Sequence, residues 1–293
     1  MSIFKAKASV KRRLFCLFLF FVGCAKADIH LNSDVNPYWA RLLHANDGAS
    51  SVVSEEFFVA PNGRFNLQAE QDTFIALLST DVVHQVACNF PARYKWLKHQ
   101  KLTSVDFDLG TCADLVQFRK GFQQKDFYLG YVTEFLDSPA SAFGHLMLIF
   151  SDPKVPQELA DAVHFAADSK GEKGLSYIAN GLSGGFRGYY VRDPFFKKAN
   201  EYLVVEQRAI HLFKIELTQD QIENLVLHLY ELRKAEFKYY FIDENCAFQL
   251  ADLINIADPM QDLRFLPNQP VLPIDVVRQN KKRISEHLSF APT

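Results

Sequence analysis

Residues 243–253 read DENCAFQLADL, in which an asparagine stands directly before a cysteine and a short apolar helical pattern follows. Asparagine is a residue type that caps helices, so the pattern predicts a helix that begins at or next to Cys246. Unpaired backbone N–H groups and the helix dipole at such a terminus favour thiolate over thiol. The stretch therefore indicates a nucleophile, although a cysteine before an apolar helix is more often a small core residue.

Residues 138–150 read SPASAFGHLMLIF, a turn that leads into a strand with His145 at its start. A cysteine on a helix tip and a histidine on a strand are the two parts of a cysteine-dependent acyl-transfer site. Ser141 does not lie in a Gly-x-Ser-x-Gly elbow, so a serine hydrolase is disfavoured. No His-Glu-x-x-His or Cys-x-x-Cys spacing indicates a metal site, and no cofactor is expected.

The first 27 residues predict a signal peptide, because a basic start precedes an apolar stretch at residues 14–22 that is too short to span a bilayer. Two processing routes fit this segment. Cleavage after Ala27 would follow a small-x-small site, whereas residues 21–24 resemble a lipobox in which Cys24 would be lipidated. No later stretch approaches ~20 apolar residues, so no transmembrane helix is expected after it. The protein is therefore expected outside the cytoplasm.

Charge and cysteine count narrow the function classes further. Loss of residues 1–27 removes six basic groups and no acidic ones, which takes the formal net charge from -2 to -8. A net-acidic chain is a poor nucleic-acid binder. The exported part keeps three cysteines, which suggests one disulfide and one free thiol. Cys88 and Cys112 are close in sequence, so we expect them to pair and Cys246 to stay reduced.

The pattern divides the chain into a helical N-terminal part, residues 28–125, and an α+β part, residues 126–293. Helices are expected at residues 37–44, 67–78, 90–97 and 115–122, with one short strand at 55–60. Strands are expected at 127–135, 145–150, 161–167 and 175–178, then a glycine-rich loop at 181–188 and a β-rich stretch at 202–217. A capping box formed by Thr218 and Gln221 opens a further helix, and residues 237–241 form an aromatic strand or extended turn.

The sequence resembles the Lnb-type family, described as an N-terminal periplasmic domain and formerly a domain of unknown function. The resemblance rests on WARLLH (39–44), EFFVAPNG (56–63), CNFPARY (88–94), SPASAFGH (138–145), GLSGGFRGY (181–189), Glu201-Tyr202, Glu206-x-Arg208 and YYFIDENC (239–246). It implies a periplasmic protein, soluble or lipid-anchored, that transfers an acyl chain from a phospholipid to the α-amino group of a diacylglyceryl-cysteine lipoprotein. The expected partners are therefore a phospholipid donor, a lipoprotein N-terminus and a membrane surface.

The order of histidine and then Asn-Cys is also similar to permuted papain-like thiol enzymes of the NlpC/P60 and lecithin:retinol acyltransferase type. This similarity implies an antiparallel sheet with the nucleophile on a helix N-terminus. Cys246 is then the nucleophile, His145 the base, and His164 a third member that holds the second nitrogen of His145. Alternatively, His164 is a structural strand residue whose side chain makes one hydrogen bond. Asn245, Glu244 and Ser141 are candidate supporting residues.

Two further expectations concern the surroundings of the site. Glu206 and Arg208 lie at alternate positions of the β-rich stretch, so they share one face and are expected to form a structural ion pair. Aromatic residues around Phe186 and at 189–190 either dip into a membrane interface or pack beside the site.

Two other function classes stay open from the sequence. A papain-like cell-wall peptidase or amidase would use the same cysteine and histidine in a polar, peptide-shaped cleft. A non-enzymatic periplasmic binding domain would merely bury Cys246. Thiol reactivity separates the binding domain from both enzymes, and substrate choice separates the enzymes from each other.

Overall fold

The computed structural model describes residues 35–46, 48–122, 126–136, 141–169, 171–172, 174–242, 244–258 and 270–292. They belong to one compact unit, Leu31–Thr293. The expected signal peptide and the possible lipidation site Cys24 lie outside the described residues.

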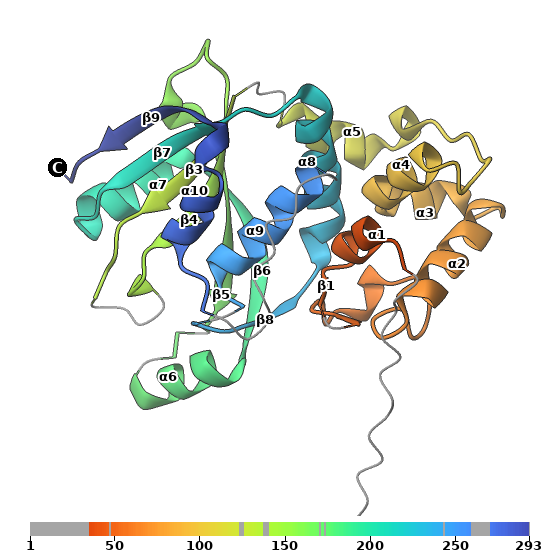
Figure 1. Ribbon diagram of the computed structural model, residues 1–293, viewed down its shortest axis with the longest axis horizontal. Helices are drawn as coiled ribbons and strands as arrows, with labels where there is room; N and C mark the ends of the chain where they lie inside the picture. The colour runs from red at the N-terminus through yellow and green to blue at the C-terminus, as the bar shows by residue number, and fades with distance from the viewer. Residues whose placement is uncertain are drawn as a thin grey trace, which may run out of the picture. The chain divides into compact units, whose positions relative to one another are not determined.

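Within the described residues, a seven-stranded antiparallel sheet forms the C-terminal part, with the spatial order β8-β6-β5-β4-β3-β7-β9 (Figure 1). Its strands are β3 (Asp126–Val132), β4 (His145–Ser151), β5 (Asp161–Asp168), β6 (Phe186–Pro194), β7 (Ile210–Ile215), β8 (Phe237–Tyr239) and β9 (Ile284–Phe290). Strands β3 to β6 pair in chain order, so they form a meander at the centre of the sheet. The expected mixed α+β class with an antiparallel sheet is confirmed.

The two faces of the sheet are covered by different helices. Leu146, Leu148 and Phe150 of β4 join the main core, which includes α8 (Gln219–Glu231) and α9 (Cys246–Ala257). Met147 and Ile149 join a second, smaller cluster that contains residues of α7 (Phe195–Ala199) and of the π-helical turn η5 (Asn200–Val205). Side chains alternate between the two faces along a strand, so His145 lies on the same face as Met147. His164 pairs with Met147 and lies on that face too, which is the face covered by η5.

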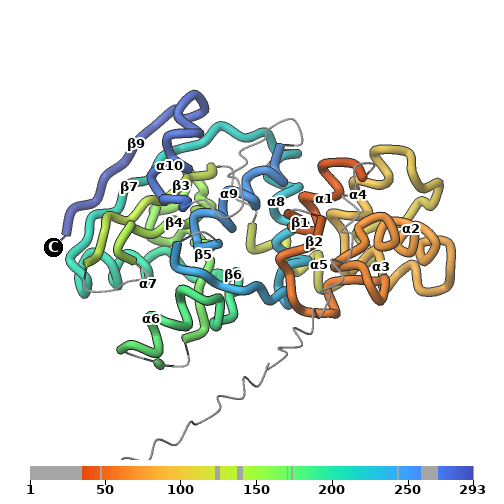
Figure 2. The backbone as a smooth tube through the Cα atoms, turned by 60° about the horizontal axis from the view of Figure 1, so that its bottom comes forward, coloured from red at the N-terminus to blue at the C-terminus, as the bar shows by residue number. Residues whose placement is uncertain are grey.

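The N-terminal part is mainly helical, as expected. It contains β1 (Ala45–Asn46), β2 (Ala49–Ser50), α1 (Pro37–Leu42), α2 (Leu67–Leu78), α3 (Val83–Asn89), α4 (Pro91–His99) and α5 (Ala113–Lys120). The views of Figures 1 and 2 agree that α8 and α9 lie between these helices and the sheet. The Cys88–Cys112 disulfide is confirmed, with Cα atoms 5.4 Å apart, and it joins α3 to the start of α5.

A buried polar network connects the N-terminal part to α8. The Arg93 guanidinium pairs with Glu70 at 3.1 Å and with Glu231 at 3.5 Å, and all three side chains are fully buried. His228 Nδ1 lies 3.2 Å from the Glu231 carboxylate, and its Nε2 lies 2.9 Å from His44 Nε2. Buried charges are tolerated when each has a partner, so this network fixes α2, α4 and α8 relative to each other.

Most expected elements are confirmed, including the Thr218 capping box of α8, but three are wrong. Residues 55–57 form a 3-10 turn, because the Glu70 carboxylate takes the Val59 and Ala60 N–H groups that a strand ladder would use. The strand expected at 175–178 is helix α6 (Gly174–Ser183), which also absorbs the start of the expected glycine-rich loop.

The third wrong element is the β-rich stretch at 202–217. Its start belongs to η5, which continues directly from α7, and only residues 210–215 form a strand. Gln207 has a positive φ of 54°, so the chain turns sharply between the two. Glu206 and Arg208 therefore do not share a strand face, although the ion pair expected between them is present at 2.6 Å.

Two of the residues considered for a membrane loop, Phe186 and Tyr190, pack inside the molecule, whereas Tyr189 is half-buried. Phe186 is buried, and its ring lies near Tyr177 and Phe241. The Tyr190 hydroxyl donates to the Gln249 carbonyl oxygen at 2.8 Å, inside α9. Neither residue is free to enter a bilayer, so the alternative of internal packing is correct.

Candidate functional site

Cys246 is the first residue of α9, and Asn245 is its N-cap, as the sequence predicts. The Asn245 Oδ1 atom accepts from the Ala247 and Phe248 N–H groups at 2.9 and 3.2 Å. Its Nδ2 atom donates to the Ile242 and Val271 carbonyls at 3.0 and 2.9 Å. The buried amide therefore caps the helix and also ties two loops to it, which only a side chain with both a donor and an acceptor can do.

His145 opens β4 directly after a glycine that the backbone requires. Gly144 has φ +94°, and a Cβ atom there would lie 2.7 Å from the Val132 carbonyl oxygen. Both the positive φ and the close approach exclude other residues without strain. The Phe-Gly-His motif thus sets the position at which the histidine enters the sheet.

His145 and His164 lie together on one face of the sheet. Met147 pairs with His164 across β4 and β5, so His145 is a diagonal neighbour of His164. Their rings meet edge to face with centroids 5.9 Å apart. His164 Nε2 lies 3.2 Å from the Asp193 carboxylate of β6. The structure thus brings the two expected histidines together and adds an aspartate behind them.

The Cys246 thiol reaches the same end of β4 from the α9 side. The N–H group of Leu146, the residue after His145, is hydrogen-bonded toward the sulfur and favours its thiolate form. The His145 ring centroid lies 6.0 Å from that of Tyr202, whose hydroxyl is also within electrostatic range of Cys246. Among the described residues, no hydrogen bond joins the sulfur to the His145 ring. The start of β4 and the start of α9 thus bring His145 and Cys246 to the same end of the sheet.

Burial decides the protonation of both groups. It raises the pKa of the Cys246 thiol from 9.0 to about 11, and this outweighs the helix N-terminus and the Leu146 and Ala247 N–H groups, which lower it. Burial thus opposes the thiolate form that the helix N-terminus favours. Burial, together with the nearby His164, also lowers the pKa of His145 well below 6.5. At neutral pH the site holds a neutral thiol beside a neutral imidazole.

Arg208 is a buried cation next to these groups. Its Nη1 atom pairs with Glu206 at 2.6 Å, and its Nε atom donates to the Thr133 carbonyl at 2.7 Å. The guanidinium lies 5.0 Å from the Tyr202 ring centroid, and its Nη2 atom is buried without a hydrogen-bond partner. Its charge lowers the pKa of Cys246 and of His145. Arg208 thus carries a free donor and a positive charge at the site.

A pocket of about 230 Å³ opens beside the histidines. Its walls combine small and aromatic side chains with a charged side formed by Lys198, Glu201 and Glu206; the lining residues are Ser141, His145, His164, Phe165, Ala166, Ala167, Ser169, Tyr177, Lys198, Glu201, Tyr202, Glu206 and Tyr239. Ser141 therefore lies at the pocket, as a supporting residue would. Glu244 does not line it, and its backbone carbonyl accepts weakly from the Tyr240 N–H at 3.5 Å.

Several residues at the site had not been assigned a role from the sequence. Asp193, Lys198 and Tyr202 come from β6, α7 and η5, elements whose type or bounds the pattern did not predict. The Glu201-Tyr202 pair was present among the segments of the family resemblance, which was the one signal that pointed to it.

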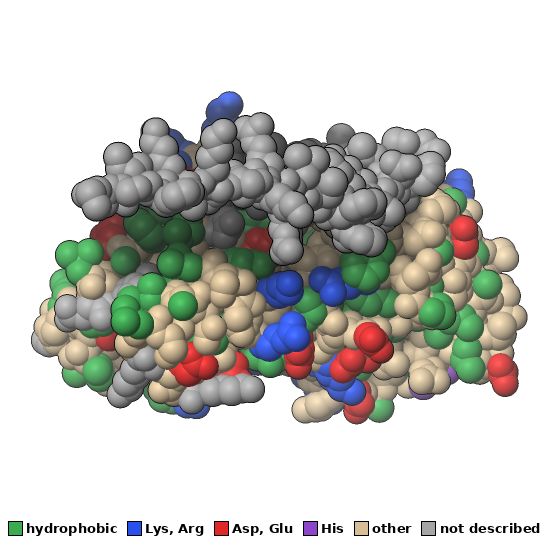
Figure 3. Space-filling model, turned by 90° about the horizontal axis from the view of Figure 1, so that it is seen from below, with side chains coloured by type: hydrophobic (Ala, Val, Ile, Leu, Met, Phe, Trp, Pro, Cys, Tyr) green, Lys and Arg blue, Asp and Glu red, His purple; other side chains and the backbone are tan. Residues whose placement is uncertain are grey.

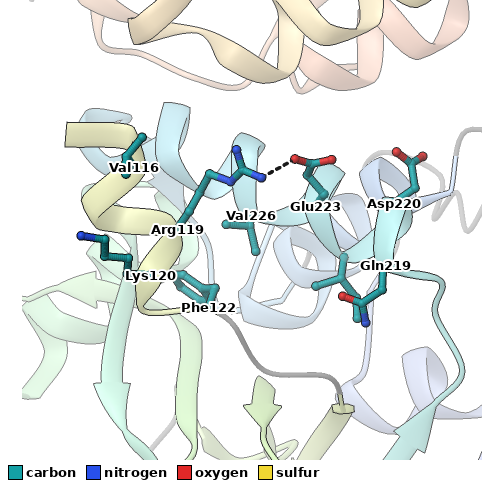
Figure 4. A pocket seen from close by; sticks show the side chains of 9 residues that line it. Val116, Arg119, Lys120, Phe122, Gln219, Asp220, Glu223 and Val226 are labelled. Carbon is teal, nitrogen blue, oxygen red and sulfur yellow. Dashed lines mark hydrogen bonds and ion pairs between the residues drawn. The ribbon is translucent and has the colours of Figure 1, made fainter. Parts of the chain in front are cut away.

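A separate groove of about 600 Å³ lies between α5 and α8 (Figure 4). Its charged side chains partly neutralise each other, with Arg119 Nη2 donating to Glu223 at 2.7 Å. None of the candidate catalytic residues lines this groove. It is therefore not part of the site at Cys246.

Comparison with known protein families identifies the family of this chain. Residues 114–283 match the family model of the Lnb N-terminal periplasmic domain, which covers more than half of the sequence. The chain belongs to this family, and the resemblance seen in the sequence is confirmed. Membership indicates a periplasmic role in lipoprotein-related processing.

Residues 32–100 match a second model, a domain of unknown function (DUF7843). The division expected between residues 125 and 126 falls inside the first match and stays a prediction. Comparisons with curated proteins and with solved structures gave no match. Within the described residues, no helix is both long and apolar enough to cross a membrane.

Proposed function

We propose that the protein is a cysteine-dependent acyltransferase that moves an acyl chain from a phospholipid to the α-amino group of a diacylglyceryl-cysteine lipoprotein. The observation that carries this proposal is the placement of Cys246, the one free cysteine among the described residues, in the first turn of α9 against the first residues of β4, beside the His145–His164–Asp193 chain. Membership of a family with a role in lipoprotein-related processing supports the choice of substrates.

In the first step, the Cys246 sulfur attacks the carbonyl carbon of a phospholipid ester. His145 takes the thiol proton through a ring nitrogen, and the backbone N–H group of Cys246 stabilises the oxyanion, since the Ala247 and Phe248 N–H groups are held by Asn245. The ester C–O bond then breaks, and His145 returns the proton to the departing alkoxide. The products are a lysophospholipid and a thioester on Cys246.

In the second step, the α-amino group of the lipoprotein attacks the thioester carbonyl. His145 accepts a proton from the amine, the C–S bond breaks, and the sulfur recovers its proton. The result is an amide and a regenerated thiol. His164, held by Asp193, would orient His145 and stabilise its positive charge during both proton transfers.

Arg208 supports the transient thiolate in this scheme. A thiol whose pKa is about 11 needs help to lose its proton at neutral pH, and Arg208 supplies an uncompensated donor and a positive charge within electrostatic range. This makes Arg208 a positioning and electrostatic residue and leaves the proton transfer to His145.

The arrangement of a strand-borne histidine followed in the chain by a helix-borne cysteine is the one expected of permuted papain-like thiol enzymes. We include that relationship in the proposal. It is supported by the antiparallel pairing of β3 to β6 and by the packing of α9 on β4 and β5.

The test is detection of the thioester. The exported protein is incubated with a palmitoyl phospholipid in detergent micelles, and peptides are mapped by mass spectrometry. We expect one hydroxylamine-labile acyl group on the Cys246 peptide, an equal amount of lysophospholipid, and loss of the adduct when a diacylated lipopeptide is added. Wild-type protein that forms neither adduct nor lysophospholipid overturns the proposal.

The charged side of the pocket favours a second candidate, a peptidase or amidase that acts on cell-wall peptides. Lys198, Glu201 and Glu206 could recognise charged peptide groups better than an acyl chain. The same mass-spectrometric assay separates the two, because this candidate releases peptide fragments from cell-wall material and leaves phospholipid intact.

A further inference from the structure

Helix α6 carries an apolar face that points to solvent. Leu175, Ile178, Ala179 and Leu182 recur at the i, i+3, i+4 and i+7 spacing of one helix face, and all are exposed. Leu175 is 86 % exposed and Leu182 53 %. In an ordinary surface helix the apolar face lies against the core. In α6 the apolar face points to solvent instead.

The opposite face of α6 packs against residues beside the pocket. Tyr177 packs on Phe186 and Phe241, and the Gly181 carbonyl oxygen accepts from the Phe241 N–H at 2.9 Å. A Cβ atom on Gly181 would lie 2.2 Å from the Phe241 ring, so the glycine allows the helix to seat closely. Tyr177 also lines the pocket with His145 and His164. The exposed face and the pocket are thus two sides of one element.

The composition of α6 suits a lipid surface. Residues 174–183 read GLSYIANGLS and contain no charged side chain. Helices that lie in a membrane interface bury an apolar face to the acyl boundary and keep polar groups above it. Ile242, the residue after Phe241, is also exposed. Figure 3 shows this face of the molecule, on which hydrophobic side chains occur at the end that carries α6 and also elsewhere.

A second copy of the chain fits this face poorly. A helix of ten residues is ~15 Å long, so one face offers an area on the order of 150 Å², far below the roughly 800 Å² per partner of a stable interface. A bilayer imposes no such minimum, because lipid adapts its shape to an inserted helix.

The volume of the pocket also favours a bilayer as the partner of the α6 face. At about 230 Å³, it is smaller than the roughly 300–1,000 Å³ of sites that enclose a whole drug-sized ligand. It can hold the reacting ester of a phospholipid, but most of each acyl chain must stay outside. A bilayer seated on α6 would keep those chains in lipid while the ester enters the pocket.

We propose that α6 docks the protein on a phospholipid bilayer through Leu175, Ile178 and Leu182 and so presents the pocket to its donor. This inference rests on the proposed phospholipid-dependent function. It predicts binding to vesicles that requires neither a lipid anchor nor a competent nucleophile.

The experiment measures co-sedimentation with vesicles of phosphatidylethanolamine and phosphatidylglycerol. Every protein carries Cys24→Ser, so that no attached lipid can contribute. The test variant is Leu175→Ser/Ile178→Ser/Leu182→Ser, and Leu175→Ser alone is included because so exposed a residue cannot be needed for folding. The matched control is Phe65→Ser/Leu102→Ser/Leu159→Ser, which removes exposed apolar side chains elsewhere.

We expect the triple α6 variant to lose at least tenfold in vesicle partitioning, the single variant to lose part of it, and the control to bind like the parent. All variants should keep the rate of Cys246 thioester formation from phospholipid in detergent micelles. A parent that ignores vesicles, or α6 variants that bind as well as the parent, overturn the docking proposal. Absence of the thioester in every protein, with vesicle binding still dependent on α6, would instead overturn the acyltransferase and leave the docking surface standing.

Discussion

Cys246 and His145 are both neutral in the resting protein, because burial acts in opposite directions on an acid and a base. It raises the pKa of the thiol to about 11 and lowers that of the imidazole well below its usual 6.5. In the proposed mechanism, no ion pair of the kind found in many cysteine enzymes therefore exists before substrate binds, and the proton moves during the attack itself.

Replacement of Cys246 by serine should abolish acyl transfer while the fold is kept. A hydroxyl is a far weaker nucleophile at neutral pH, and the change in volume at this buried position is small. Turnover should fall by at least ~10³-fold, and thermal unfolding by circular dichroism should stay near wild type. A serine or alanine variant with near-normal turnover would remove Cys246 from the mechanism.

The acid limb of the pH profile should lie below pH 6.5. His145 acts as a base only when neutral, and its lowered pKa keeps it neutral until the pH falls well under the usual histidine value. The kcat/KM for a soluble ester should therefore stay flat from pH 8 down through about pH 6.5 and drop only at lower pH. A midpoint at or above 6.5 would show that a different group controls the rate.

Arg208 should control the acidity of the thiol. The Arg208→Gln variant should raise the pKa of Cys246 and slow its alkylation by iodoacetamide at a fixed pH by roughly tenfold, which corresponds to about one pKa unit. Arg208→Lys should restore part of the rate, because it keeps the charge.

Removal of Arg208 also leaves the Glu206 carboxylate unpaired, so the control is Glu206→Gln/Arg208→Gln. If the double variant alkylates like wild type, the effect comes from the stranded carboxylate and not from the lost cation.

At the scale of elements, the helix cap Asn245 is predicted to require its amide. In Asn245→Asp the carboxylate can still accept from α9, but it faces the Ile242 and Val271 carbonyls, removes the donor of the Val271 carbonyl and leaves the Ile242 carbonyl with the Val271 N–H at 3.3 Å. The cost should be about 1–3 kcal/mol in the free energy of unfolding. Chemical denaturation measures it.

Asn66 provides the matched control for this cap. It caps α2 through the Ala69 N–H alone and is exposed, so Asn66→Asp should be neutral or slightly stabilising. Equal stability of the two aspartate variants would contradict the role assigned to the Asn245 amide.

The sequence predicted those elements whose pattern is locally complete. The cap and helix at Cys246, the capping box of α8 and the apolar strands β3 to β5 each contain their own signal. Residues 175–178 span barely one helical turn, too few to show the period of α6, so their apolar pattern predicts a strand where the structure has a helix. Strand β6 was missed because glycine and charged residues interrupt its period, and its pairing with β5 decides its form.

The site was predictable only in part for the same reason. The cysteine and histidine stand in motifs, but their protonation depends on burial that no local pattern contains. The Asp193 partner of His164 follows from the register between β5 and β6, and the place of Arg208 follows from the positive φ at Gln207. These are properties of chain segments brought together by folding.

At the scale of the whole molecule, the N-terminal part supports α9, the helix that begins at Cys246. The Tyr38 hydroxyl donates to the Ile256 carbonyl at 2.7 Å, at the far end of α9, and His44 Nδ1 lies 3.9 Å from the Asp252 carboxylate in its middle. The His44–His228 contact then joins this support to α8. The two matched family regions therefore share one buried network.

This network should make the fold sensitive to acid. Burial, opposed by Glu231 and helped by His44 and Arg93, lowers the pKa of His228 from 6.5 to about 4. Between these values the unfolded chain binds a proton that the folded chain does not, so stability is full above pH 6.5 and falls as the pH drops toward 4. The loss should be on the order of 3 kcal/mol.

Chemical denaturation across this pH range measures the effect, with His228→Gln expected to flatten the dependence. His99→Gln, on the exposed end of α4, serves as the control and should leave it unchanged. A His228→Gln variant that loses stability with acid as steeply as wild type would show that another group is responsible.

The burial of Cys246 has a consequence for export into an oxidising compartment. Sulfenic acid formation and mixed disulfides with oxidoreductases both need an accessible thiolate, and the Cys246 residue is only 2 % exposed and protonated at rest. Cys88 and Cys112 can therefore be oxidised to their disulfide without capture of the third thiol. If Cys246 is the nucleophile that we propose, the burial that raises its pKa also protects it from oxidation.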